Sequence, residues 1–258
     1  MCGIVGYIGS DAATPFLLKA LRRLEYRGYD SVGIATISRH GVLDIVKTAG
    51  RIDNLMEILP DDPPTSRVGI GHTRWATHGA PTSKNAHPHV GGVDSIAIVH
   101  NGVIANHDEL REQLKSQGYE FCSDTDSEVI AHQIHRHLYG PERDPDASTD
   151  AGRTAISALH KAVQSIHGSY AVVVLLREQP DMLLAARHGR PLVIGAVADG
   201  YVVGSDLYAL SEHATELTRL GDGEFTIIQN NTAQIFTRYP DRNVTHHGTV
   251  VYRLSSVN

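Results

Sequence analysis

Cysteines, long apolar runs and surplus positive charge are all scarce in this chain of 258 residues. Its two cysteines, Cys2 and Cys122, are too few for a disulfide-stabilised scaffold. Apolar runs such as residues 170–176 are far too short to span a bilayer. The opening residues, MCGIVGYIG, lack the basic segment and long apolar stretch of a secretory signal peptide. With 23 basic and 29 acidic side chains, a formal charge of −6, the chain is unlike proteins that coat nucleic acids.

These absences predict a soluble cytoplasmic protein that binds neither nucleic acid nor a membrane. Its hydrophobic fraction of 41% is sufficient for a sizeable core. A fold of this size buries roughly three quarters of its unfolded surface. Residues 60–66 and 140–152 are rich in Pro, Asp or Gly, which is typical of surface loops. We therefore expect residues 1–258 to form a single domain.

Secondary-structure signals indicate many short strands with helices between them. Short β-branched or aromatic runs, most of them bounded by turn-forming residues, predict strands at 3–8, 32–38, 68–72, 96–100, 169–176, 191–197, 201–204, 225–229, 233–237 and 249–254. Four helices are expected: one capped by Thr14 with Pro15 in its first position, one from Asn106 to a stop at Gly118, one from Asp126 or Ser127 to Tyr139, and one over 153–166. This order lacks regular strand–helix alternation and favours two packed sheets covered by helices.

Cys2 offers a nucleophile at the start of the chain. If Met1 is removed, the thiol and a free α-amine lie on the same residue. The α-amine has a reference pKa of roughly 7.7–8.0, so near neutral pH it can accept the thiol proton. A strand over residues 3–8 would hold this terminus in a sheet. The alternative is a buried cysteine without a catalytic role, which is also what we expect of Cys122.

Residues 72–79, HTRWATHG, follow a predicted strand. The planar guanidinium of Arg74 suits a carboxylate, and Trp75, the single tryptophan, suits closure over a small ligand. The alternatives are a surface ion pair for Arg74 and core packing for Trp75. The segment continues through Thr77 and His78 into a loop that contains Gly and Pro.

Two further segments carry polar groups at the ends of predicted elements. In IVHNG, residues 98–102, the Asn101 amide and the Gly102 N–H offer two donors to one oxyanion. The same dipeptide is common in hairpin turns, which is the alternative. In SDTDSE, residues 123–128, Asp126 either caps a helix or pairs with an ammonium group.

Taken together, these segments resemble a known family. The motifs that carry the resemblance are MCGIVGYIG, LRRLEYRGYDSVGIA, GHTRWATHGAPTSKNAHPH, VHNGVIANHDELR, SDTDSEVIAH, ARHGRPLVIG and VGSDLYAL. They look like the class II glutamine amidotransferase domain, one of the N-terminal-nucleophile hydrolases. The phrase RRLEYRGYDS favours the branch formed by the glutaminase domains of glucosamine-6-phosphate synthases (glutamine–fructose-6-phosphate aminotransferases). The resemblance implies a four-layer αββα sandwich with two mainly antiparallel sheets.

The resemblance also implies roles for particular residues. Cys2 would attack the side-chain amide of L-glutamine, and its α-amine would move the proton. Asn101 and the Gly102 N–H would hold the oxyanion. The other implied contacts are to the substrate: Arg74 to its α-carboxylate, Asp126 to its α-ammonium, Thr77 and His78 as lining, and Trp75 in the closing loop. A glutamyl thioester would yield glutamate, and ammonia would pass to a second site for amino-sugar synthesis. Arg27 and Gly28 lie in a matching motif without a definite role.

The resemblance implies no cofactor. The 16 histidines lack the spacing of a structural zinc site, so we expect no metal. Nothing in the chain matches the sugar-isomerase domains of glucosamine-6-phosphate synthase, so a synthase or isomerase domain or subunit is the expected partner that accepts ammonia. Three alternatives stay open: a stand-alone glutaminase subunit that feeds a different synthase, a related hydrolase of another amide, and a non-catalytic glutamine-binding module.

Overall fold

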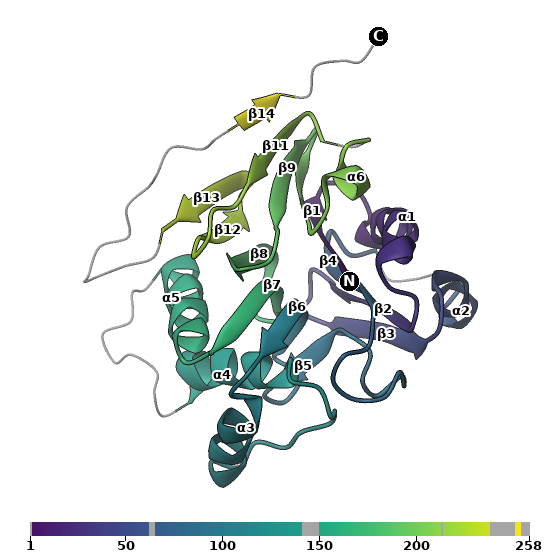
Figure 1. The fold of residues 1–258 in the computed structure, drawn as a ribbon. Coiled ribbons are helices and arrows are strands. Elements are labelled where there is room, and N and C mark those ends of the chain that lie inside the picture. The colour runs from purple at the N-terminus through teal and green to yellow at the C-terminus, as the bar shows by residue number, and fades with distance from the viewer. Residues whose placement is uncertain (1, 62–64, 141–149, 213, 238–250, 254–258) are drawn as a thin grey trace.

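Two antiparallel sheets dominate the computed structural model, which describes residues 2–61, 65–140, 150–212, 214–237 and 251–253 (Figure 1). The larger sheet has the order β14 (Val251–Arg253), β11 (Glu216–Arg219), β9 (Val193–Val197), β10 (Gly200–Gly204), β1 (Gly3–Gly9), β4 (Val68–Arg74), β2 (Ser31–Ile37) and β3 (Leu43–Ala49). The smaller has the order β13 (Thr232–Phe236), β12 (Phe225–Gln229), β8 (Gln179–His188), β7 (Gly168–Leu176), β6 (Ile96–Ile104) and β5 (His89–Gly91).

Helices cover the outer face of each sheet. The larger sheet is covered by α1 (Ala13–Leu24), α2 (Ile52–Ile58) and the short α6 (Leu207–Leu210), with the 3-10 turn η1 (Glu25–Arg27) after α1. The smaller is covered by α3 (His107–Ser116), α4 (Glu128–Tyr139) and α5 (Ala151–Gln164). A separate apolar cluster fills the space between the sheets. The predicted αββα sandwich is therefore confirmed.

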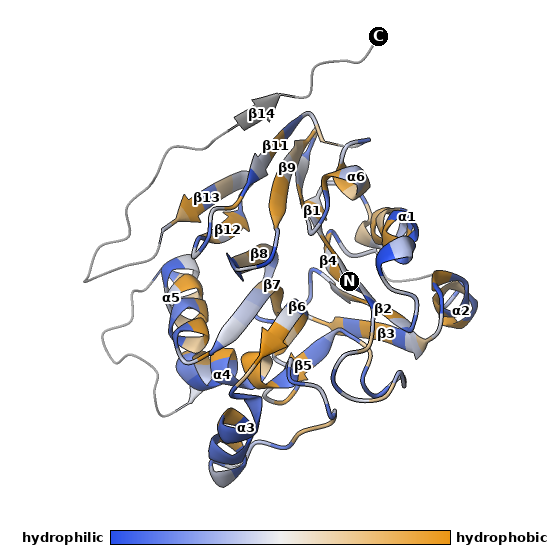
Figure 2. Cartoon of the chain, in the orientation of Figure 1, coloured by the Kyte–Doolittle hydropathy of each residue, from blue (hydrophilic) through white to orange (hydrophobic). Residues whose placement is uncertain are grey.

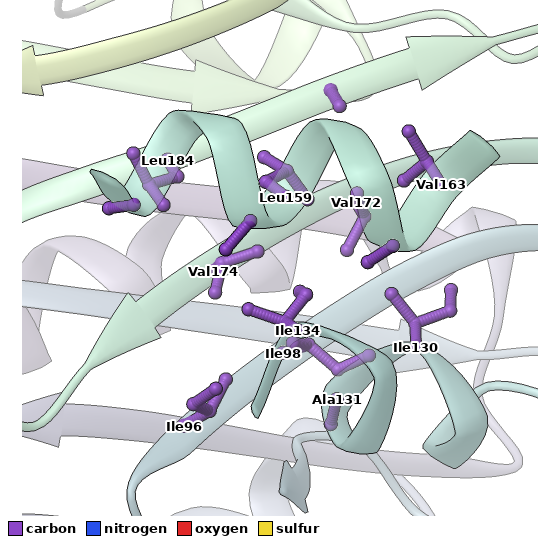
Figure 3. Packing of buried hydrophobic residues seen from close by; sticks show 14 of the residues in the cluster. Ile96, Ile98, Ile130, Ala131, Ile134, Leu159, Val163, Val172, Val174 and Leu184 are labelled. Atoms are coloured by element: carbon purple, nitrogen blue, oxygen red, sulfur yellow. The ribbon is translucent and has the colours of Figure 1, made fainter. Parts of the chain in front are cut away.

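The sequence of β7 shows why this layering forms. Successive strand residues point to opposite faces. Val172 and Val174 pack beneath α4 and α5, whereas Val173 and Leu175 belong to the cluster between the sheets. Figure 3 shows Val172 and Val174 beside Leu159. Both faces are buried, so β7 is a continuous apolar run, while α5 in Figure 2 has an apolar and a polar side.

Most predicted strands are present, and two of the missed strands, β8 and β3, have identifiable causes. β8 contains Pro180, Asp181 and two alanines, which are poor strand signals. β3 carries Asp44 and Lys47 and lies at the sheet edge, half-buried along its length. The sequence analysis also missed β5, β11, α2 and α6. The predicted strand at 249–254 lies largely outside the described residues, of which 251–253 form β14.

Two predicted helix starts are wrong in detail. α1 begins at Ala13 instead of Pro15, and Thr14 does not cap it, because the Ala13 N–H donates to the Ser66 carbonyl at 2.7 Å. α5 begins at Ala151 instead of 153, because the Asp150 carboxylate accepts from the first-turn amides.

The Asn106 side chain does not cap α3. Its amide bonds the Ser165 carbonyl and the His167 N–H, each at 2.9 Å. The stop at Gly118 is confirmed, because α3 ends at Ser116 and Gly118 has a φ of +88°.

The packing of α4 predicts a stability difference between two isoleucines. Ile134 is fully buried against β6 and β7, whereas Ile58 at the end of α2 is 52% exposed. We expect Ile134→Ala to lower the free energy of unfolding by about 2–5 kcal/mol, since it leaves a cavity. Ile58→Ala should change it by less than about 1 kcal/mol. Urea unfolding measures both, and equal losses would contradict the layered packing.

Candidate active site

Cys2 lies where the central strand β1 begins. Antiparallel pairing of Gly3 with Thr73 brings Cys2 to the end of β4. There the Trp75 N–H donates to the Cys2 Sγ at 3.2 Å, and the Trp75 carbonyl lies 3.5 Å from the same sulfur. The thiol is half-buried, so the reading of Cys2 as a fully buried residue does not hold.

The surroundings of the thiol keep it protonated. Burial raises the pKa of Cys2, while the Trp75 N–H and the positive charge of Arg74 act in the opposite direction with smaller effect. A thiol with a raised pKa is a weak nucleophile and needs a base. Met1 lies outside the described residues, so the α-amine assigned to this task in the sequence analysis stays a prediction.

The Cys2 carbonyl is held by two side chains. The Asn101 Nδ2 donates to it at 3.0 Å and the Arg27 Nε at 3.2 Å. Arg27 is itself paired with Asp206 at 2.5 Å, and the Tyr26 hydroxyl donates to the same carboxylate at 2.8 Å. The main chain of the first described residue is therefore fixed from two sides.

The structure gives supporting roles to three residues whose roles the sequence did not indicate: Arg27, Gly28 and Asp30. A Cβ at Gly28 would lie 2.6 Å from the Arg74 carbonyl carbon, so only glycine permits this close approach. The Asp30 carboxylate accepts from the Ala76 N–H at 2.8 Å and orients the segment after β4. The signal was present, because all three residues lie in the EYRGYDS stretch of the resemblance.

Asn101 and Gly102 belong to β6 and do not form the hairpin turn that was their alternative. β6 is a strand of the smaller sheet, so the site is assembled from both sheets. Gly102 has a φ of +148°, and a Cβ there would collide with the Ser169 carbonyl oxygen. The strand therefore requires glycine beside Asn101.

Arg74 is buried and forms none of the surface ion pairs that were its alternative. Its guanidinium donates to the carbonyls of Ala80 at 3.1 Å and Gly79 at 3.0 Å, and also to that of His78. The residues after β4 thus fold back over the arginine. Burial lowers the pKa of Arg74, and the nearby acidic groups and thiol raise it.

Trp75 is 45% exposed, so it is not a core residue. Its ring meets Tyr29 edge-on with centroids 5.6 Å apart. Thr77 is exposed, and His78 is half-buried with its ring against His107 at 5.4 Å. These three residues of the HTRWATHG motif therefore lie on the loop around Arg74, with Trp75 contacting the thiol through its main chain.

Asp126 does not cap the helix that follows it. Its Oδ2 accepts from the Ile104 N–H at 2.8 Å, two residues beyond Gly102, and Ser127 is the residue before α4. The buried carboxylate thereby joins the SDTDSE turn to the end of β6. The structure brings this turn and the end of β6 close to Arg74. The negative charge of Asp126 acts to raise the pKa of Arg74.

Glu128 anchors the same turn from inside. Its carboxylate accepts from the N–H groups of Cys122 and Ser123, each at 2.7 Å, and from the Ser123 hydroxyl at 2.6 Å. Burial raises the pKa of Glu128, but these bonds and the neighbouring His132 outweigh it and lower the pKa to about 2. The expectation that Cys122 is buried is wrong, because its side chain is exposed. Only its main-chain N–H takes part in the turn, as a donor to Glu128.

Several histidines in this region are buried, and burial lowers the pKa values of His72, His87, His89 and His100. In the described parts of the chain, no group of three or more His, Cys, Asp or Glu residues is arranged to hold a metal ion. Within the same residues, no helix is long and apolar enough to cross a membrane.

Comparison with known proteins identifies the class. Residues 72–212 match the glutamine amidotransferase domain, and the chain belongs to this family. It is 46% identical over 237 residues to a glutamine–fructose-6-phosphate aminotransferase (isomerizing) of Pseudomonas syringae pv. tomato, covering 92% of this chain and 37% of the relative. A protein of the same name from Methanosarcina acetivorans is 43% identical over 240 residues, with 92% and 38% covered. The chain thus spans less than two fifths of these relatives.

Solved structures confirm the fold. A glutamine phosphoribosylpyrophosphate amidotransferase from B. subtilis, complexed with ADP and GMP, superposes with a TM-score of 0.74 at 26% identity, covering 91% of this chain and 48% of that one. A glutamine aminotransferase class-II domain protein from Silicibacter pomeroyi has a TM-score of 0.54 at 17% identity, covering 93% and 100%, and supports the fold alone. The chain has the N-terminal-nucleophile hydrolase fold expected from its motifs.

The position of Glu128 predicts how stability depends on pH. Its contribution is complete above the ordinary pKa of 4.5 and is lost as the pH falls toward its folded value of about 2. We expect Glu128→Gln to lower the free energy of unfolding by roughly 2–3 kcal/mol at pH 7, and the difference from wild type to shrink below pH 4.5.

Chemical denaturation of both proteins between pH 7 and pH 3 tests this expectation. Glu109→Gln is the matched control, because Glu109 is exposed on α3. A Glu128→Gln deficit that stays constant over this pH range would show that ionisation of Glu128 is not its source.

Proposed function

We propose that this chain hydrolyses L-glutamine to glutamate and ammonia through a covalent intermediate on Cys2. The observation that carries the proposal is the arrangement at the start of β1. The thiol contacts the Trp75 N–H, and the Asn101 amide bonds the main chain of the same cysteine. Membership of the glutamine amidotransferase family supports glutamine as the amide that is cleaved.

The reaction proceeds in two halves once Met1 has been removed. The α-amine of Cys2 takes the thiol proton, and the sulfur attacks the side-chain amide carbon. The Asn101 Nδ2 and the Gly102 N–H donate to the oxyanion. The carbon–nitrogen bond then breaks, and the protonated α-amine returns its proton to the leaving group, which departs as ammonia. Water attacks the thioester, releases glutamate and restores the thiol.

The two α-groups of the substrate need partners of opposite charge. Arg74 binds the α-carboxylate, and Asp126 binds the α-ammonium. Both residues are buried, which strengthens their interaction with a charged ligand. Thr77 and His78 line the pocket, and the exposed ring of Trp75 lies on the loop that closes over glutamine.

The ammonia is used in amino-sugar synthesis. The aminotransferase relatives support this role, and their greater length supports a synthase or isomerase domain or subunit as the acceptor. We propose that the 258 residues act as a single glutaminase domain in the cytoplasm, without a cofactor or metal.

Removal of the Cys2 thiol is the first test. Cys2→Ala should abolish glutamate release, because no nucleophile remains, while Cys2→Ser retains a trace at most. Glutamate release and the N-terminal mass are measured in the same sample, and circular dichroism verifies the fold. Cys122→Ala is the matched control and should keep full activity, since Cys122 is exposed and its side chain lies outside the site. Full activity of Cys2→Ala would overturn the proposal.

Loss of the Asn101 amide is the second test. Removing one oxyanion donor typically lowers turnover on the order of 100- to 1,000-fold, or about 3–4 kcal/mol. We expect Asn101→Ala to show a fall of this order in kcat. Asn106→Ala provides the control, because the Asn106 side chain bonds residues 165 and 167 instead of Cys2. Unchanged turnover in Asn101→Ala would remove Asn101 from the oxyanion site.

A further inference from the structure

A row of buried imidazoles lies directly behind Asn101. The His72 ring of β4 stacks on His87 with centroids 4.1 Å apart, and His87 meets His89 at 4.4 Å. His72 and Asn101 come from different sheets, and the His72 Nε2 lies 3.0 Å from the Asn101 Oδ1. This contact joins the two sheets immediately beneath the Cys2 main chain.

The direction of each hydrogen bond in this row follows from the carbonyls at its two ends. The Cys2 carbonyl can only accept, so the amide nitrogen of Asn101 faces it and Oδ1 faces His72. The His72 Nε2 also lies 3.1 Å from the His100 carbonyl, a second acceptor. With acceptors on both sides, Nε2 must carry the hydrogen, and Nδ1 has none.

Burial keeps His72 in this neutral form. It lowers the pKa of His72 to about 3, although the bonds to Asn101 and to the His100 carbonyl act in the opposite direction. Among the described residues, the His72 Nδ1 has no hydrogen-bond partner, so Nε2 is the only ring nitrogen with a bonding role. The ring plane is fixed by the stack on His87.

We propose that His72 is a positioning residue, whose Nε2–H holds the Asn101 side chain with its amide nitrogen toward the reacting cysteine. A flipped amide would present Oδ1 to the Cys2 carbonyl and to the developing oxyanion, and both contacts would be repulsive. One amide hydrogen is bonded to the Cys2 carbonyl, which leaves the second for the oxyanion. The inference rests on the proposed role of Asn101 in amide hydrolysis.

A double-mutant cycle between His72 and Asn101 tests this role. His72→Phe keeps an aromatic ring beside His87 but lacks the N–H donor. We expect kcat for glutamine hydrolysis to fall roughly tenfold or more in H72F, with KM within about twofold, because a misplaced donor affects the transition state more than the bound substrate. In the Asn101→Ala background the same change should have no further effect, since the group it orients is gone.

Two variants separate donation from packing. His72→Gln retains an amide N–H for Asn101 and should recover most of the kcat lost in H72F, whereas His72→Leu should not. His87→Phe places the same substitution in the neighbouring ring of the stack, which bonds the His100 N–H and not Asn101, so its kcat should stay within about twofold of wild type. If H72F does not fold, the comparison of H72Q with H72L carries the test.

Each outcome identifies which assignment fails. Wild-type kcat in H72F, or equal kcat in H72Q and H72L, would overturn the positioning role while leaving the oxyanion role intact. Losses that multiply in the H72F/N101A double variant would show that His72 does not act through Asn101, which also overturns the inference. Unchanged turnover in N101A alone would instead overturn the oxyanion assignment on which the inference rests.

Discussion

The pairing register between β1 and β4 is the constraint on which the site depends. Side chains alternate along a strand, so a shift of one residue would turn Cys2 to the opposite face and separate it from the Trp75 amide. β1 is paired on its other side with β10, which makes it a central strand whose start cannot slide independently. The Cys2 thiol, although near the start of the chain, is thereby positioned by a strand that is paired on both sides.

The buried polar groups behind the site are also held in place by their partners, in this case through side-chain hydrogen bonds. Buried donors and acceptors destabilise a fold unless they are paired. One set of hydrogen bonds connects the Cys2 carbonyl to Asn101 and Asn101 to His72. A second set holds the 122–128 turn through Glu128. Lys47 closes the loop that carries His87, because its ammonium donates to the Ala86 and Pro88 carbonyls at 2.8 and 3.0 Å. Few of these groups can move without leaving another unpaired.

The sequence allowed much of the fold to be predicted, and the reasons are local. Runs of β-branched residues predict β7 and β1. An apolar face that ends at Gly140 predicts α4. β8 could not be recognised, because its strand state is imposed by pairing with β7 and β12 and not by its own Pro180, Asp181 and alanines. The start of α1 was misplaced because the Ala13 N–H donates to the distant Ser66 carbonyl, which takes the place of a side-chain cap.

The residues of the site also fall into two groups, those recognisable from the local sequence and those whose roles depend on distant partners. Cys2, Arg74, Asn101 and Asp126 could be singled out because each follows or begins a recognisable element in a familiar motif. The roles of the supporting residues could not be assigned, because their partners are distant in sequence. Arg27 reaches Asp206 across 179 positions, and His72 reaches Asn101 across 29. Chemistry-bearing side chains are visible in a sequence, whereas the groups that orient them become visible only when the sheets are assembled.

The guanidinium of Arg74 already has acceptors of its own, the carbonyls of Gly79 and Ala80 among them. These bonds use three of the five guanidinium N–H donors, so an anion that binds there meets a cation whose orientation the loop has already fixed. The bonds from the guanidinium to the loop carbonyls are charge-assisted on one side only, whereas a carboxylate adds a full negative charge, so it interacts more strongly with this cation than an uncharged amide does. The loop thus orients the guanidinium before any ligand arrives, and a preference for charged over uncharged partners follows from a cation held in one orientation.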